Sequence, residues 1–168
     1  MDLFIERIVA KKKDYVDYLI IISTMIISFF VALIIILMTG PVLFGVGVGL
    51  VTIIGYIGYR IITSRNIEYE YSLTNGDLEI SKIVAKKRRK RIFYGSCRQF
   101  EVMDKASSEK HKRFVNGEMN KIHAVSSMKS QDVYFFISNY NDRKTIVYFE
   151  PDEKIIDKIK SLNRKAFL

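Results

Sequence analysis

The fold of this chain is decided by the stretch LIIISTMIISFFVALIIILM (Leu19–Met38) and by VLFGVGVGLVTIIGYIGY (Val42–Tyr59), which follows after only Thr39, Gly40 and Pro41. As α-helices the two stretches would be about 30 Å and about 27 Å long, close to the ~30 Å hydrocarbon core of a bilayer. Neither stretch contains Lys, Arg, Asp or Glu. The sequence therefore predicts two membrane-spanning helices, residues 19–38 and 42–59, joined by an external turn at residues 39–41.

Basic residues flank the outer ends of this pair of stretches. Lys11, Lys12 and Lys13 precede the first, Arg60 and Arg65 follow the second, and the turn between them is uncharged. The first stretch is too long for the apolar part of a signal peptide, and no small-x-small cleavage pattern follows it, so we expect it to be retained. The positive-inside rule then predicts a multi-pass protein of the cell membrane with both termini in the cytoplasm.

Small side chains recur along both stretches. Small residues allow helices to approach closely in lipid, where no hydrophobic force draws them together. We expect them to pack the two helices against each other, and homodimerisation is the alternative use. The absence of charged residues within the spans argues against an ion pathway. The candidate packing residues are Thr24, Ser28 and Ala32 in the first stretch and Gly45, Gly49, Thr52 and Gly55 in the second.

The first 18 residues place apolar side chains at Phe4, Ile5, Ile8 and Val9, which is helical spacing. They are read either as a short cytoplasmic helix at the membrane surface or as the frayed start of the first span. Residues 60–66 would be a linker to one cytoplasmic domain, residues 67–168. All of the net charge of +9 lies after the spans, because residues 60–168 contain 23 basic and 14 acidic side chains.

The pattern changes to strands after Arg65. Apolar and polar residues alternate over residues 67–74, and Asn75-Gly76 is a strong hairpin signal, since both residues tolerate positive φ. A returning strand leads to the basic run at 86–91 and then to Ile92-Phe93-Tyr94. Residues 105–130 have a weaker pattern, with short strands expected at 114–115 and 122–125 around a turn at 116–117. A second hairpin is predicted from 132–138 and 145–149, and an amphipathic helix follows Pro151, with its apolar face formed by Ile155, Ile156, Ile159 and Leu162.

About seven short antiparallel strands followed by one C-terminal α-helix is the order of a pleckstrin-homology-like, partly open barrel closed by that helix. The segments 71–74, 78–80 and 92–94 resemble the opening of bacterial pleckstrin-homology-like domains, and Tyr148-Phe149-Glu150-Pro151-Asp152 resembles their ending. With Phe4, Glu6, Val9 and Lys11 and the double span, the chain resembles an uncharacterised family of small two-span membrane proteins of low-GC Gram-positive bacteria. The resemblance implies this fold and no established activity.

The basic run is the one feature with chemical content. It reads as a solvated hairpin tip, as a signal for cytoplasmic retention, or as a contact for anionic lipid headgroups, to which each cation near the leaflet contributes ~1 kcal/mol. Nucleic acid is a poorer partner, because few aromatic residues beside the run are available for base stacking. The residues are Lys86, Lys87, Arg88, Arg89, Lys90 and Arg91.

No catalytic, cofactor or metal site is predicted. His111, His123 and Cys97 are scattered without the spacing of a zinc site or a nucleophilic pair, and a single cysteine excludes an internal disulfide. We expect a non-enzymatic membrane-anchored module that binds anionic lipid or a protein partner at the inner leaflet. The alternative is an accessory subunit of a larger membrane complex that docks through the hairpin of helices. Oligomeric state cannot be read from the sequence.

Overall fold

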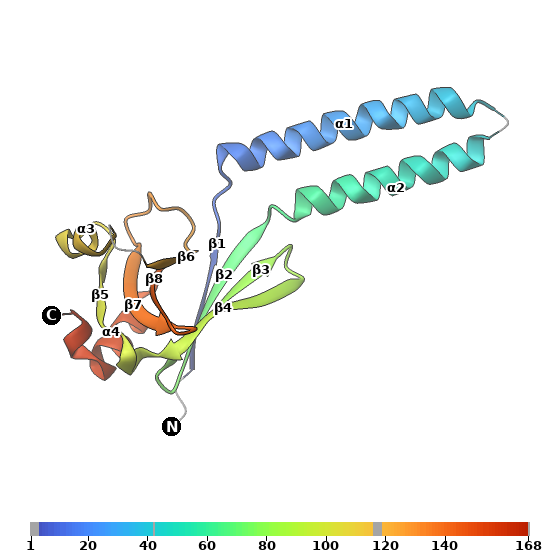
Figure 1. Ribbon diagram of the computed structural model, residues 1–168. Helices are drawn as coiled ribbons and strands as arrows, with labels where there is room; N and C mark the ends of the chain where they lie inside the picture. The colour runs from blue at the N-terminus through green and yellow to red at the C-terminus, as the bar shows by residue number, and fades with distance from the viewer. Residues whose placement is uncertain (1–3, 42, 116–118, 168) are drawn as a thin grey trace. The chain divides into compact units, whose positions relative to one another are not determined.

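The computed structural model describes residues 4–41, 43–115 and 119–167 and divides into two compact units. One unit, the helical hairpin, is Lys13–Asn66. The other, the sheet unit, combines the residues up to Lys12 with those from Ile67 onward (Figure 1). The predicted turn at 116–117 and Val42, the predicted start of the second span, lie outside the described residues.

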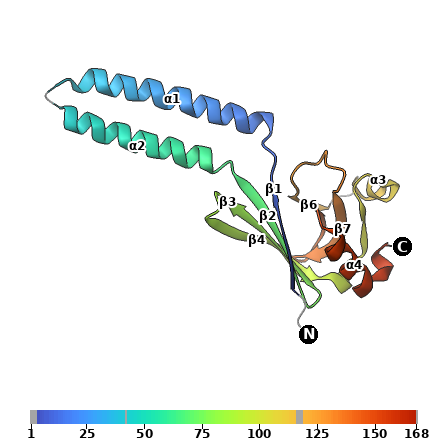
Figure 2. The same ribbon diagram turned by 180° about the vertical axis from the view of Figure 1, so that it is seen from behind.

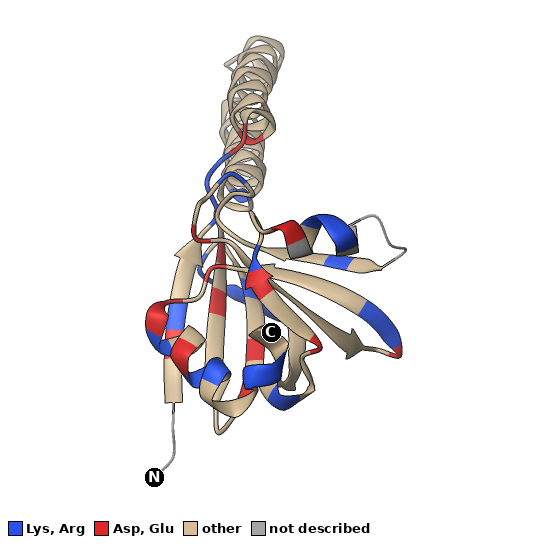
Figure 3. Ribbon diagram, turned by 90° about the vertical axis from the view of Figure 1, so that its left-hand side faces the viewer, with Lys and Arg blue, Asp and Glu red and all other residues tan. Residues whose placement is uncertain are grey.

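Two long helices form the helical hairpin. The first, α1, is Tyr15–Thr39 and the second, α2, is Phe44–Thr63. Both are long and apolar enough to cross a membrane, and Figure 3 shows them free of charge over almost their whole length. α1 begins before its apolar stretch, after the N-cap Asp14, whose amide donates to the Asp17 side chain. α2 begins at Phe44, within its stretch, and continues past Tyr59 to Thr63, so that residues 60–63 of the predicted linker are helical.

The residues before the first helix form a strand, which corrects both sequence readings of this segment. Strand β1 (Phe4–Ala10) pairs antiparallel with β2 (Ile67–Thr74), and Figures 1 and 2 show the two strands side by side. Its Ile5 and Val9 pack against the core of the sheet unit. Seven residues are too few for a stable isolated helix, whereas the edge of β2 offers both backbone partners and apolar cover. The predicted domain of residues 67–168 therefore lacked one of its strands.

The sheet unit contains two four-stranded sheets. Sheet A has the order β1-β2-β3-β4, with Asn75–Gly76 joining β2 to β3 as the sequence predicted. Sheet B has the order β5-β7-β8-β6, and its β7–β8 hairpin is the second predicted one. The remaining bounds are β3 (Asp77–Val84), β4 (Arg88–Ser96), β5 (Val102–Lys105), β6 (Asn120–Ala124), β7 (Tyr134–Tyr140) and β8 (Arg143–Phe149), with the short helices η1 (Cys97–Gln99) and η2 (Arg164–Phe167).

Two details differ from the expected run of about seven antiparallel strands. Among the described residues there are eight strands, and β6 pairs with β8 in parallel. Phe114, expected in a short strand, belongs to the helix α3 (Glu109–Val115). The two sheets are not closed into a barrel, since no pairing joins a strand of sheet A to a strand of sheet B in the described chain.

The main core lies between the two sheets. Tyr71 of sheet A meets Phe149 of sheet B edge to face, and Phe93 meets Phe136 in the same way. The opposite face of sheet B is also apolar and forms a second cluster with residues near α3. Burial on both faces explains why β7 and β8 read as nearly continuous apolar runs, YFFIS and TIVYF.

The C-terminal helix α4 (Glu153–Leu162) closes the main core as predicted. The Asp152 side chain caps it by accepting a hydrogen bond from the Ile155 amide at 2.9 Å. Ile155 and Ile159 are fully buried in the core, and Leu162 packs against it.

Candidate functional site

The basic residues predicted as a hairpin tip occupy a turn and the first half of a strand. Ala85, Lys86 and Lys87 form the turn between β3 and β4, and residues 88–91 begin β4. All six basic side chains at positions 86–91 are exposed. We call β3, β4 and this turn the basic hairpin.

The turn of the basic hairpin has an unusual backbone for its sequence. Ala85 and Lys86 have φ of 54° and 55°, and the Lys87 amide donates a 3.1 Å hydrogen bond to the Val84 carbonyl. Positive φ is disfavoured for residues with a Cβ by about 1 kcal/mol or more, and Asn or Gly relieves it. Strand pairing and this hydrogen bond hold the turn in place despite that cost.

The strand register separates the basic run into two faces. Lys90 lies opposite Lys82, whose neighbour in β2 is the buried Tyr69, so Arg88 and Lys90 lie on the face of sheet A that carries the core. Arg89 and Arg91 lie on the opposite, outer face, because successive side chains of a strand alternate. A shift of register between Ile80 and Ser81 lets Phe93 return to the core.

The two arginines on the outer face have acidic partners. Arg89 forms an ion pair with Glu70, whose side chain is only 7 % exposed. The Arg91 guanidinium lies 4.0 Å from Glu79 and 5.4 Å from the centre of the Tyr94 ring. Burial raises the pKa of Glu70, Arg89 lowers it, and the neighbouring carboxylates of Glu6 and Glu79 raise it. The charge on this face is therefore largely balanced.

The core-side face of the basic hairpin has cations without acidic partners. Its members are Lys82, Arg88 and Lys90, which we call the unpaired face. None of the three has an ion pair or side-chain hydrogen bond with any described residue. Lys82 and Lys90 are directly opposite each other, and like charges in that position destabilise a sheet. An anion bound at this face would relieve that repulsion.

The basic hairpin reaches the end of sheet A at which the chain enters from the helices. Ile67, the first residue of β2, pairs with Val84, and Val84 pairs with Arg88. The other end of β3 carries the Asn75–Gly76 turn, where a Cβ on Gly76 would lie 3.4 Å from Leu162 of α4.

A buried polar network links the two sheets. The Tyr71 hydroxyl donates to the Ala124 carbonyl and accepts from the Glu150 amide at 3.2 Å. The Ser126 hydroxyl donates to the Glu150 carboxylate at 2.9 Å, and the Ser126 carbonyl accepts from the Lys12 amide at 2.9 Å. Burial raises the pKa of Tyr71, which keeps its hydroxyl protonated as a donor. The network fixes the end of β1 to sheet B and has a structural role.

The two histidines lie on either side of Tyr148, which the sequence did not indicate. His111 Nε2 is 3.0 Å from the Tyr148 hydroxyl, and the His123 ring stacks on the Tyr148 ring with 4.8 Å between centroids. Burial and the charge of Lys121 lower the pKa of both histidines. Cys97 is buried in the other core, and burial raises its pKa to about 12. In the described part of the chain no metal-binding cluster of His, Cys, Asp or Glu occurs.

The helix packing uses different glycines from those expected. A Cβ on Gly58 would lie 3.0 Å from the Ser28 hydroxyl and 3.8 Å from a Thr24 methyl, so the predicted stripe of α1 does contact α2. A Cβ on Gly47 would lie 2.5 Å from the Thr39 hydroxyl. These two buried glycines lie on the α2 face that also includes Val51 and Ile54, at helical spacing, and this face was not predicted from the sequence.

The remaining predicted packing residues face elsewhere or are less closely packed. A Cβ on Gly45, Gly49 or Gly55 would meet nothing within 4 Å. Thr52 is exposed and donates to the Val48 carbonyl of its own helix at 2.9 Å, while Ala32 is half-buried.

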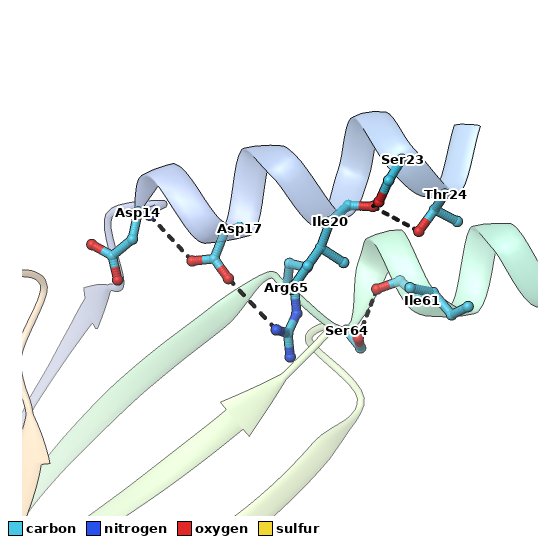
Figure 4. A network of polar contacts seen from close by, with 8 residues as sticks. All are labelled: Asp14, Asp17, Ile20, Ser23, Thr24, Ile61, Ser64 and Arg65. Carbon is cyan, nitrogen blue, oxygen red and sulfur yellow. Dashed lines mark hydrogen bonds and ion pairs between the residues drawn. The ribbon is translucent and has the colours of Figure 1, made fainter. Parts of the chain in front are cut away.

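A polar network closes the open end of the helical hairpin (Figure 4). Arg65 lies 3.7 Å from the Asp17 carboxylate, and Asp17 also accepts from the Asp14 amide at 3.2 Å. Nearby hydroxyls of Ser23 and Thr24 donate to the Ile20 carbonyl of the same helix. Arg65, counted in the sequence only as a topology signal, therefore also joins the end of the second helix to the start of the first.

The whole chain, residues 1–168, matches the family model described as a bacterial PH-like domain. No curated protein and no solved structure matched the chain. The match agrees with the two sheets and the C-terminal helix, and it brings no activity or ligand with it.

Proposed function

Because this chain belongs to the bacterial PH-like domain family, we propose that it is a non-enzymatic, membrane-anchored binding module whose basic hairpin contacts anionic lipid headgroups at the cytoplasmic leaflet. The observation that carries the proposal is the unpaired face. Its cations have no counter-charge among the described residues, at the end of sheet A where the chain arrives from the helices.

The pairing of β1 with β2 supports a topology in which the segment before α1 and the segment after α2 lie on the same side of the membrane. β1 precedes the first helix and β2 follows the second, yet they are neighbours in one sheet. Two helices that both cross the bilayer return the chain to the side on which it started, as this pairing requires. The basic residues before Asp14 and after Tyr59 favour the cytoplasm as that side.

Chain connectivity limits how far the basic hairpin can lie from the bilayer surface, whatever the arrangement of the two units. From Thr63 at the end of α2 to Ile67 the chain can span at most about 14 Å. Two steps across the sheet, about 10 Å, lead from Ile67 to Arg88. Long Lys and Arg side chains extend this reach toward the ~8 Å layer in which an anionic leaflet is strongly felt.

The expected free energy of the lipid contact is modest, but it is sufficient to hold the hairpin of an already anchored protein at the leaflet. Each cation near an anionic leaflet contributes about 1 kcal/mol, so the unpaired face with Lys86 and Lys87 supplies several kcal/mol before losses. Anchoring by two helices removes most of the cost of bringing the hairpin to the membrane, because the contact becomes intramolecular.

The proposal is tested with the full chain in vesicles. A fluorophore on Lys87→Cys would be quenched by lipids that carry a nitroxide on the headgroup, and the buried Cys97 would react little under the same conditions. We expect quenching to be greater in phosphatidylglycerol than in phosphatidylcholine vesicles and to fall as salt rises from about 0.05 to about 0.5 M.

Two double variants provide a matched comparison. R88S/K90S removes two cations of the unpaired face, and R89S/R91S removes two that are already paired with carboxylates. At about neutral pH the first should lose most of the lipid-dependent quenching, and the second should retain it. Equal loss in both variants, or quenching that ignores lipid charge, would refute the proposed lipid contact.

A second function, accessory subunit of a membrane complex, is favoured by one observation. Gly45 and Gly49 form a G-x-x-x-G pair on α2 with open space at both Cβ positions, a surface suited to a partner helix. Gly49→Leu should then release a stoichiometric membrane partner from the purified complex, while Val48→Leu on the neighbouring face should not. Absence of such a partner in mild detergent would leave the lipid-binding module as the better account.

A further inference from the structure

On the outer face of sheet A, a nearly buried carboxylate of β2 holds one cation of the basic hairpin. The Glu70 side chain is 7 % exposed, whereas that of its partner Arg89 is 61 % exposed. The arginine is therefore held at its tip by the carboxylate and is otherwise open to solvent. Without that contact its guanidinium would be free to reach another anion.

The surroundings of Glu70 make its negative charge costly. Its direct neighbours across the sheet are Ile8 on β1 and Ser81 on β3, neither of which carries a charge. The charged groups that act on it are the carboxylates of Glu6 and Glu79 and the guanidinium of Arg89, and Arg91 lies on the same face against Glu79. Two carboxylates and burial thus oppose the one cation that contacts Glu70.

We propose that Glu70 is a proton-sensitive counter-charge that holds Arg89 at neutral pH and releases it to the anionic leaflet when it is protonated. The inference rests on the proposed lipid contact and adds its regulation. The direction of the Glu70 pKa shift, upward because burial outweighs the attraction of Arg89, supports it.

The membrane itself would favour the release. An anionic leaflet with a surface potential of about −30 to −50 mV concentrates protons about three- to seven-fold at its surface. A hairpin that approaches the leaflet therefore encounters a lower pH than the same hairpin in bulk solvent. Protonation of Glu70 would then add the charge of Arg89 to that of the unpaired face, so that contact strengthens itself.

The test uses the same labelled full chain in phosphatidylglycerol vesicles, with quenching measured from about pH 7.5 down to about pH 4.5, near the ordinary pKa of a Glu side chain. One extra cation at the leaflet corresponds to about a five-fold rise in the ratio of contacting to free hairpins. Glu70→Gln should show, at every pH, the strong quenching that the parent reaches only at low pH. Glu79→Gln alters the longer pair with Arg91 and removes one carboxylate that raises the pKa of Glu70, so it should retain the pH dependence but shift it to lower pH.

R89S/R91S completes the test: it removes the cation that favours ionised Glu70, so Glu70 stays neutral over more of this range and contact should change less with pH than in the parent. A thermal melt of each variant verifies folding, and Glu70→Gln should remain folded, because the raised pKa means that the charged form of Glu70 burdens the folded state at neutral pH. Contact that depends on salt but not on pH in the parent would overturn this inference and leave the lipid contact standing. No contact at any pH would instead refute the proposed function.

Discussion

The two ends of strand β3 carry turns with the same sign of φ and opposite chemistry. At one end Asn75 and Gly76 have φ of 51° and 102°, and these residues accept such angles at low cost. At the other end Ala85 and Lys86 have φ of 54° and 55° with no such tolerance. The first turn lies under α4, and the second carries the basic run. One end of the strand is thus optimised for folding, while the other keeps a strained turn beside unpaired cations.

The largest effect on stability should come from a substitution in α4, the helix next to the Asn75–Gly76 turn. Ile159→Asp places a carboxylate at a fully buried position, which removes about 1.5 to 3 kcal/mol of apolar burial and adds the desolvation of a charge. We expect the full chain to lose the cooperative thermal transition of the sheet unit. Circular dichroism of the chain in detergent measures this transition. The exposed Lys154→Asp in the first turn of α4 should melt like the parent, and if Ile159→Asp does so too, α4 is not docked on the core.

The next effect concerns β1, whose Phe4 pairs with Thr74 beside the Asn75–Gly76 turn. Replacing the inward Ile5 and Val9 by Ala should destabilise the sheet unit by about 2 to 4 kcal/mol, because both side chains pack on the core. Exposed Phe4 and Ile8 provide the matched pair, and their replacement by Ala should change the melting temperature little. Equal effects of the two pairs would mean that β1 contributes its backbone alone.

An exchange of turn chemistry tests the comparison itself. Ala85→Asn with Lys86→Gly should stabilise the sheet unit by about 1 to 2 kcal/mol, because both residues relieve the positive φ. Gly76→Lys should destabilise it by a similar amount, since its φ of 102° is strained for any side chain and Leu162 lies nearby. Denaturant titration of both variants measures the difference, and a loss of stability in the Ala85→Asn, Lys86→Gly variant would contradict the comparison.

The smallest effect is a pH dependence that arises at the two histidines beside Tyr148 of sheet B. Because the pKa values of His111 and His123 are lowered in the folded chain, their contribution to stability is full above about pH 6.5 and is lost as pH falls through the folded pKa. Replacing both histidines by Gln should reduce the dependence of the melting temperature on pH in this range. An unchanged profile would assign the acid sensitivity to other groups, and the variant also separates unfolding from release of Arg89.

The predictable part of the fold came from strong local signals. Uncharged stretches of bilayer length, the Asn75-Gly76 turn and the apolar face of α4 each require one structure by their own chemistry. β1 was not predictable, since FIERIVA fits both periods and is a strand only because the distant β2 offers an edge. The same holds for the site. The basic run was evident, but its two faces depend on the cross-strand partners Glu70 and Lys82, which no local pattern specifies.

The central claim is that the unpaired face brings the basic hairpin to an anionic leaflet, and the position of Lys87 relative to that leaflet tests it most directly. A spin label on Lys87→Cys in the full chain, reconstituted in phosphatidylglycerol nanodiscs, reports its depth by collision with oxygen and with a water-soluble nickel complex. We predict that the label lies within about 8 Å of the headgroups at low salt and moves into solvent in phosphatidylcholine discs or in the R88S/K90S variant. Equal solvent exposure in both lipids, with and without Arg88 and Lys90, would contradict the account.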